Sequence, residues 1–200
     1  MKLGVLGGTF DPIHNGHMAV ADEVRKRLEL DEILFIPTGQ PWLKAEKPLT
    51  EAKYRTEMVR LAIADRSYYK LSTMEIDREG PSYTVDTMAE LKNQCGNGSD
   101  LFFILGWDSL AELPEWREPG RIIRLCRLVA VPRPGYKRPD LKMLEKNIPG
   151  LTERVTVLDK PKVDISASDI RERVGRGQAI GGLVPEAVKR YIREKGLYRS

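Results

Sequence analysis

The chain has 200 residues, 41% of them hydrophobic, and a formal net charge of +4. This length suits one well-packed domain over residues 1–200 and is too short for two independent ones. The two cysteines, Cys95 and Cys126, lie outside any metal-binding spacing, so we expect no zinc site, no disulfide framework and a cytoplasmic location. Since no apolar run approaches the length of a membrane span and the charge excess is small, we expect neither a membrane nor a nucleic acid as partner.

Short apolar runs alternate with helical repeats along the chain. Strands are predicted at 2–6, 32–37, 70–75, 101–105, 127–131 and 154–158. Their nearly continuous apolar character indicates strands that are buried on both faces, as in a parallel sheet. Helical spacing is seen around 20–28, 54–62, 85–91 and 185–192. The alternation predicts a doubly wound, mostly parallel α/β sheet of the Rossmann type, and segments 38–50 and 133–138 are predicted as mobile loops.

The most informative segment is GGTFDPIHNGH at 7–17, directly after the first predicted strand. Gly7 and Gly8 allow a tight turn and a close approach of the backbone to a ligand. Amides near Thr9 and Phe10 are then in position to donate to phosphate oxygens. The spacing differs from that of a Walker loop and from the dinucleotide GxGxxG pattern.

The only two histidines of the chain, His14 and His17, lie in the same segment. Gly16 and His17 open the next helix, and the amino end of a helix favours an anion. Residues three apart on a helix lie side by side, about 5–6 Å apart at Cβ, so both rings can donate hydrogen bonds to a triphosphate. Taken singly, each residue also suits a turn, a helix cap or a packing position. The whole string between a strand and a helix favours a phosphate site.

GGTFDPIHNGH resembles the signature of the HxGH nucleotidyltransferase superfamily and, in its details, the bacterial nicotinate-nucleotide adenylyltransferases. A second segment, ISASDIR at 165–171, resembles the family's ISSTxIR box, with Ala167 and Ser168 in place of Ser and Thr. The resemblance implies that Ser166, Ser168 and Arg171 hold the outer phosphates of ATP, and that helices at about 167–196 complete the ATP site. An ordinary helix cap with a solvated arginine is the structural alternative.

Two central segments bear on the substrate. GPSYTVDT at 80–87 resembles the family's GPSYTxDT, which implies that the Thr84 amide binds the nicotinate carboxylate. Free N–H groups at a helix start suit a carboxylate better than a neutral amide. GWD at 106–108 resembles the family's GxD, with Gly106 beside an Asp108 that accepts from a ribose hydroxyl.

The roles of three further residues are implied by the resemblance alone. Trp116, followed by Arg117, matches the aromatic that stacks on the pyridine ring, and Lys44 matches a loop lysine that reaches phosphate. A core aromatic and solvated charges are the structural alternatives for these positions.

The function implied is transfer of the adenylyl group of ATP to nicotinate mononucleotide, giving nicotinate adenine dinucleotide and pyrophosphate in NAD biosynthesis. No activated nucleophile and no acidic cluster is recognisable, which favours direct in-line attack with His14, His17 and Arg171 stabilising charge. Magnesium is expected to arrive with ATP, held mainly by phosphates and water, and to need few protein ligands. Nicotinamide mononucleotide, pantetheine phosphate or glycerol phosphate as substrate, and a nucleotide-sensing module, are alternatives. Association of identical chains is left open.

Overall fold

The computed structural model describes residues 1–41, 49–96 and 98–199. A six-stranded sheet forms its centre, in the order β4-β2-β1-β6-β7-β8, and every neighbouring pair of these strands is parallel. The strands are β1 (Lys2–Gly8), β2 (Glu32–Pro37), β4 (Tyr69–Leu71), β6 (Asp100–Gly106), β7 (Arg127–Val131) and β8 (Val155–Val157). A short parallel pair, β3 (Gln40–Pro41) with β5 (Pro81–Ser82), lies beside it.

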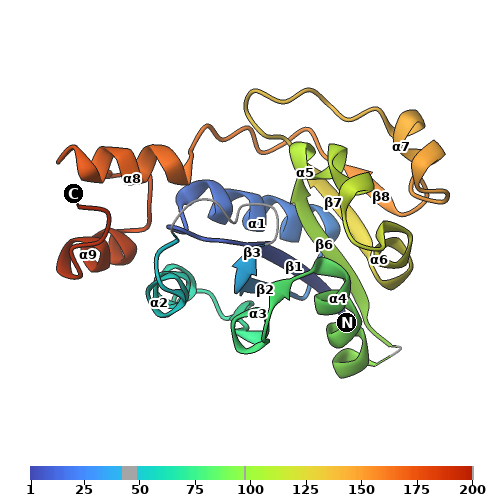
Figure 1. The fold of residues 1–200 in the computed structure, drawn as a ribbon, viewed down its shortest axis with the longest axis horizontal. Helices are drawn as coiled ribbons and strands as arrows, with labels where there is room; N and C mark the ends of the chain where they lie inside the picture. Colours follow the sequence, from blue (N-terminus) through green and yellow to red (C-terminus); the bar gives the residue numbers. More distant parts are fainter. Residues whose placement is uncertain (42–48, 97, 200) are drawn as a thin grey trace.

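Helices cover both faces of the main sheet (Figure 1). They are α1 (Asn15–Leu28), α2 (Ala52–Ile63), α3 (Met74–Asp77), α4 (Thr84–Cys95), α5 (Trp107–Ala111), the 3-10 turn η1 (Leu113–Glu115), α6 (Pro119–Leu125), α7 (Leu141–Asn147), α8 (Ala167–Gly175) and α9 (Glu186–Glu194). In the described part of the chain, no helix is both long enough and apolar enough to cross a membrane.

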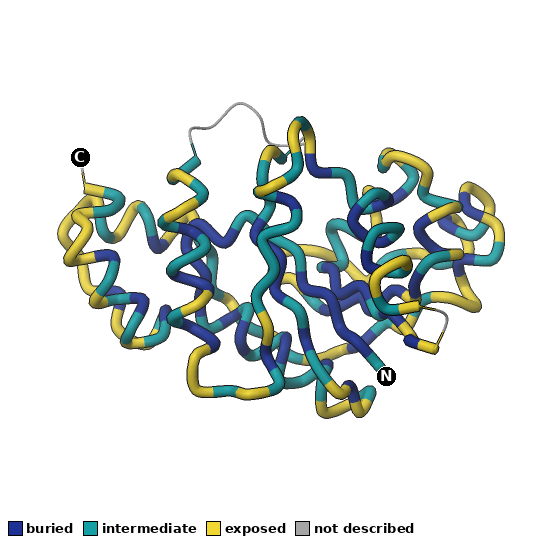
Figure 2. Tube along the Cα trace, turned by 90° about the horizontal axis from the view of Figure 1, so that it is seen from below, coloured by how far each residue is buried: buried dark blue, intermediate teal, exposed yellow. Residues whose placement is uncertain are grey.

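Side chains along β1 point alternately to the two faces of the sheet and belong to two separate hydrophobic cores. Leu6 packs with α1, α2, α8 and α9 on one face, whereas Val5 packs with α4, α6 and α7 on the other. Successive residues of a strand point to opposite faces, so a strand in the middle of a doubly covered sheet must be apolar throughout. Figure 2 shows the result: a buried interior along the strands within an outer layer of exposed helix surface. The predicted doubly wound, mostly parallel fold is confirmed.

The strand order places the site. The connections run outward from β1 in one direction to β2 and β4, and in the other through β6 to β7 and β8. Ligands of such sheets bind where this order reverses, at the carboxyl ends of the two central strands. Here these ends are Gly8 of β1 and Gly106 of β6.

The predicted strand at 70–75 is wrong in its second half, because β4 ends at Leu71 and α3 begins at Met74. Two hydroxyl side chains cause the break. The Ser72 hydroxyl accepts from the Met74 amide at 3.4 Å, and the Thr73 hydroxyl donates to the Asp77 carboxylate at 2.6 Å. Such local bonds offer the backbone an alternative to the sheet. Segment 133–138 forms an exposed turn between β7 and α7, and residues 42–48 of the other predicted loop lie outside the described residues.

A buried arginine ties the loops at the carboxyl ends of β1 and β2 to the start of α2. Arg55, 2% exposed, donates from Nη1 to the carbonyl oxygens of Thr9 and Thr38 and from Nε to that of Thr50, each at 2.8 Å. Three carbonyls that the sheet does not pair are thereby satisfied by one side chain.

Arg55→Met should lower the free energy of unfolding by about 3–5 kcal/mol, because three partly buried carbonyls lose a charged donor. Urea denaturation measures this change. The matched control is Arg60→Met on the same helix, where the guanidinium pairs with Glu57 at the exposed surface, and there we expect little change. Equal losses for the two variants would contradict this role of Arg55.

Candidate active site

The loop after β1 is held by an aromatic ring rather than by glycine alone. Phe10 adopts a left-handed backbone conformation, with φ of 48°, and its side chain is 1% exposed. Its ring contacts the ring of His17 edge-on, with centroids 5.0 Å apart, and a Cβ added at Gly8 would lie 3.3 Å from it. The apolar anchor therefore fixes the path of the backbone from β1 into α1.

His14 and His17 cap the start of α1 reciprocally. His14 Nδ1 accepts from the His17 amide at 3.3 Å, and His17 Nδ1 accepts from the His14 amide at 3.2 Å. The rings stack with centroids 3.7 Å apart, as the spacing predicts. A Cβ at Gly16 would lie 2.9 Å from His14 Nδ1, so the glycine leaves room for the ring. Capping uses Nδ1 of each ring and leaves Nε2 available, so a capping role does not exclude a ligand-binding role for these residues.

The capping bonds fix the tautomer of both histidines. A ring nitrogen that accepts a hydrogen bond bears no hydrogen, so each neutral ring has its hydrogen on Nε2. Burial and, more weakly, the charge of Arg133 lower the pKa of His14 to about 4. The pKa of His17 is also well below its usual value, because of burial, then His14, then Arg133. Both rings are neutral donors at neutral pH.

Asp11 connects the loop to two distant segments. Its buried carboxylate accepts from the Tyr198 hydroxyl at 2.6 Å and from the Thr50 amide at 3.1 Å. Its carbonyl accepts from Arg171 Nη1 at 2.7 Å. From the sequence alone, Asp11 is one residue of a motif and has no role of its own. Its structural role depends on partners that lie far away in the chain, so no local pattern indicates it.

The two terminal motifs meet in space. Arg171 of α8 reaches the Asp11 carbonyl across 160 positions, and its Nη2 donates to Ser168 Oγ at 3.3 Å. Ser166 is the N-cap residue of α8 and makes no side-chain capping bond. The segment that resembles ISSTxIR thus places a cation and hydroxyl groups beside the loop of 7–17.

A charged pair follows β6 and β7. Asp108 Oδ2 lies 3.0 Å from Arg133 Nη1, while Asp108 Oδ1 is buried without a partner. A Cβ at Gly106 would collide with Asp108 Oδ1, which explains the glycine of this motif. Arg133 was missed from the sequence. The signal was present, since a basic residue two positions after a buried parallel strand lies at the carboxyl end of the sheet.

The start of α4 forms another part of the site. Thr84 is the first residue of the helix, so its amide and that of Val85 have no acceptor within the helix. Arg117 lies 4.7 Å from the centre of the Tyr83 ring and 3.6 Å from the Asp86 carboxylate.

Trp116 faces the core on the α4 side of the sheet. Its ring contacts Phe103 edge-on, with centroids 6.1 Å apart, and its Nε1 is buried without a partner. Phe103 Cε2 also lies 3.7 Å from the position of a Cβ at Gly7, so one ring separates Trp116 from the carboxyl end of β1. Lys44 lies outside the described residues. Within the described ranges, no group of three or more His, Cys, Asp or Glu side chains is arranged to hold a metal ion.

Fold and site define a class of protein. The family model described as cytidylyltransferase-like matches residues 5–173. In the solved structures, nicotinic acid mononucleotide adenylyltransferase of Plasmodium falciparum superposes with a TM-score of 0.81, at 23% identity, covering 98% of this chain and 97% of that one. At that identity the likeness concerns the fold. The chain is a member of the cytidylyltransferase-like nucleotidyltransferases.

Curated relatives narrow the class. A probable nicotinate-nucleotide adenylyltransferase of Dehalococcoides mccartyi is 53% identical over 198 residues, covering 99% of this chain and 97% of the relative. One of Roseiflexus sp. is 48% identical, covering 98% of both. Within its class, the chain belongs to the nicotinate-nucleotide adenylyltransferase family.

The lowered pKa of His14 makes folding stability depend on pH. A histidine whose pKa is 6.5 in the unfolded chain and about 4 in the folded chain takes up a proton on unfolding between these values. The free energy of unfolding therefore falls as the pH drops from 6.5 to 4, by about 3 kcal/mol from this group. His14→Asn keeps a capping acceptor without a titratable ring. Urea denaturation of both proteins from pH 7 to 4 should give diverging curves, and parallel curves would contradict the shift.

Proposed function

We propose that the chain transfers the adenylyl group of ATP to nicotinate mononucleotide, forming nicotinate adenine dinucleotide and pyrophosphate. The observation that carries this proposal is the stacked pair of His14 and His17, whose donating Nε2 atoms are fixed by the capping bonds and which lies close to the Arg133 cation. Such a cluster stabilises phosphate charge, and neither ring offers a free nucleophilic nitrogen, because each Nδ1 accepts a capping bond and each Nε2 bears the hydrogen. The solved relative from Plasmodium falciparum is complexed with NaAD, the product proposed here.

The reaction is a direct displacement. An oxygen of the mononucleotide 5′-phosphate forms a bond to the α-phosphorus of ATP, and the bond between that phosphorus and the bridging oxygen breaks, releasing pyrophosphate. His14 and His17 donate from Nε2 to the triphosphate as negative charge moves towards the leaving group. Amides of the 7–10 loop and the amino end of α1 add further donors. The protein accelerates the reaction by positioning and charge stabilisation.

The remaining groups divide between the substrates. Arg171 and Ser168, with Ser166 at the start of α8, hold the outer phosphates, so the helices at 167–196 complete the ATP site within one domain. Asp108 accepts from a ribose hydroxyl through the oxygen that has no protein partner. Arg133, paired with that carboxylate and near both histidines, binds phosphate. Lys44 contributes a further phosphate contact, as the family resemblance implies.

ATP enters as its magnesium complex. Mg²⁺ retains water and binds phosphate oxygens readily, so it needs few protein ligands. The proposal places the reaction in the cytoplasm, where the free thiols of Cys95 and Cys126 stay reduced.

The start of α4 supports the acid as substrate. Two amides without intrahelical acceptors, together with the positive helix end, match a carboxylate at the pyridine ring, whereas a carboxamide would direct one of its own donors at them.

Nicotinate mononucleotide should therefore exceed nicotinamide mononucleotide in kcat/KM by roughly 30- to 1,000-fold, corresponding to about 2–4 kcal/mol. Pyrophosphate release from ATP, measured with these two substrates and pantetheine phosphate, tests the proposal. Equal kcat/KM values for nicotinate and nicotinamide mononucleotide would contradict the proposed contact of the Thr84 amide with the nicotinate carboxylate. Turnover with pantetheine phosphate alone, or none at all, would contradict the function.

Trp116→Ala should raise KM for the mononucleotide about 5- to 150-fold with little change in kcat, because stacking far from phosphorus stabilises ground and transition states alike. KM for ATP should hardly change, and Trp116→Phe should restore most of the binding. If Trp116 serves only the core beside Phe103, the alanine variant instead loses several kcal/mol of stability with an unchanged KM. Steady-state kinetics and a melting temperature on one preparation separate these results.

A further inference from the structure

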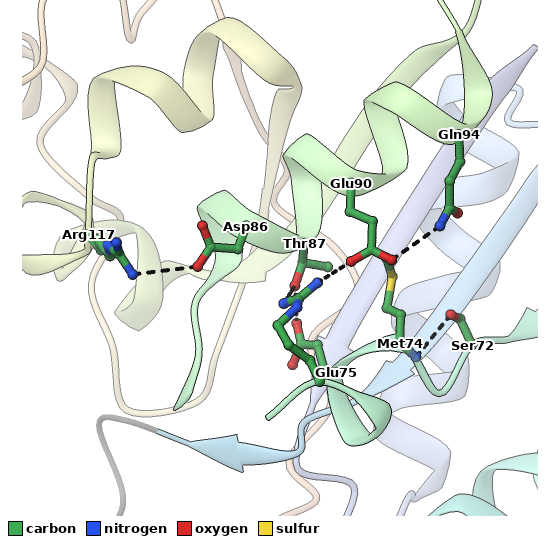
Figure 3. Close-up of polar contacts among 9 residues, drawn as sticks. Ser72, Met74, Glu75, Asp86, Thr87, Glu90, Gln94 and Arg117 are labelled. Atoms are coloured by element: carbon green, nitrogen blue, oxygen red, sulfur yellow. Dashed lines mark hydrogen bonds and ion pairs between the residues drawn. The ribbon is translucent and has the colours of Figure 1, made fainter. Parts of the chain in front are cut away.

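A buried carboxylate lies behind the start of α4 and takes no direct part in the proposed adenylyl transfer. Glu75 of α3 is 8% exposed, and its Oε1 accepts from the Thr87 hydroxyl at 2.8 Å. The side chains of Ser82 and Thr38 lie close enough to the same carboxylate to lower its pKa. Figure 3 shows Glu75 and Thr87 pointing towards each other from α3 and α4. Ser82 precedes Thr84 by two positions and Thr87 follows it by three, so one carboxylate holds both sides of the turn.

The direction of these hydrogen bonds requires an acceptor at position 75. Arg78 Nη1 donates to Thr87 Oγ1 at 3.1 Å, and the Gly39 amide donates to Ser82 Oγ at 3.2 Å. Each hydroxyl accepts an N–H and keeps its single hydrogen for another acceptor: Thr87 donates that hydrogen to Glu75 Oε1, and Ser82 lowers the pKa of the same carboxylate. A carboxylate has acceptor sites for all of these donors and brings no hydrogen of its own. Glutamine has one acceptor oxygen instead of two, so its NH₂ group would face a hydroxyl that now donates, and that hydroxyl would have to turn its hydrogen away from position 75.

The same carboxylate joins the turn to the segment after β2. Thr38 and Gly39 follow β2 directly, and β3 then pairs with β5 through Gln40 with Pro81 and Pro41 with Ser82. Gly39 packs so closely on α3 that a Cβ there would collide with the Glu75 carbonyl oxygen. Glu75 therefore fixes the start of α4 relative to the carboxyl end of β2. Burial raises the pKa of Glu75, against the effect of its hydrogen bonds and of Arg78.

We propose that Glu75 is a positioning residue that sets the amides at the start of α4 for the carboxylate of the substrate and thereby determines selectivity for the acid over the amide. The inference rests on the proposed function. Selectivity of this kind depends on donors held within a fraction of an ångström, since charge-assisted hydrogen bonds weaken steeply when misaligned. Glu75 touches no substrate and acts through Ser82 and Thr87.

Glu75→Gln tests the proposal, with Glu90→Gln as its matched control. Glu90 pairs with the same Arg78, at 2.5 Å, but lies on the outer side of α4, and no hydrogen bond described here joins it to Ser82 or Thr87. Kinetics with both mononucleotides should show KM for the acid raised about tenfold in Glu75→Gln and the preference for the acid reduced by about the same factor. KM for ATP should stay within about twofold. Glu90→Gln should match the wild-type chain.

A second pair of variants keeps the test decisive if Glu75→Gln does not fold. Thr87→Val removes the hydroxyl at constant shape and should reproduce the loss of preference, whereas Thr87→Ser keeps the hydroxyl and should restore it. Variants that lower the melting temperature while the preference for the acid is unchanged would overturn the role of Glu75 and leave the proposed function intact. A wild-type chain without transfer to nicotinate mononucleotide would overturn both.

Discussion

One guanidinium satisfies the ends of three segments around the nucleotide site. The partly buried carbonyls of Thr9, Thr38 and Thr50 accept from it, and each lies just outside the regular element beside it. Only arginine offers several N–H groups in a rigid plane that can satisfy such an arrangement. Burial lowers the pKa of Arg55, and the nearby charge of Asp11 opposes that shift. The loop after β1 and the segment after β2 thus share one anchor, on which the rest of the site depends.

The histidine pair combines a structural role with the chemical role proposed for it, in the same two rings but through different nitrogen atoms. Capping uses the Nδ1 atoms and so assigns the hydrogens to Nε2, which turns a helix start into two oriented donors. Burial keeps both rings neutral, so the closed loop does not have to accommodate a buried positive charge. Arg133 supplies the permanent charge from the edge of the site, where its half-exposed side chain remains hydrated.

Local patterns in the sequence predicted most of the sheet and the start of α1, because these depend on short-range periodicity and on one contiguous motif. A place for Arg171 beside the first loop was implied only by the family resemblance, since no short-range pattern relates residues 160 positions apart. The predicted strand at 70–75 was wrong where side chains replace the hydrogen bonds of the sheet. The hydroxyls of Ser72 and Thr73 form local hydrogen bonds, and β4 ends before them. Local patterns also gave no role to Arg55 or Glu75. A charged residue within an apolar repeat resembles a solvated one until the tertiary contacts that surround it are known.

The bond between Tyr198 and Asp11 spans 187 positions of the chain. At about 5–20 residues per second, a ribosome adds the tyrosine about 10 to 40 seconds after the aspartate. The central strand β1 and its glycine-rich turn are synthesised early, but the Asp11 carboxylate in that turn cannot form its bond to Tyr198 until the tyrosine has been added. Assembly of the nucleotide site is thereby coupled to synthesis of almost the whole sequence, and β1 must stay protected from wrong strand pairing until β6 has been made.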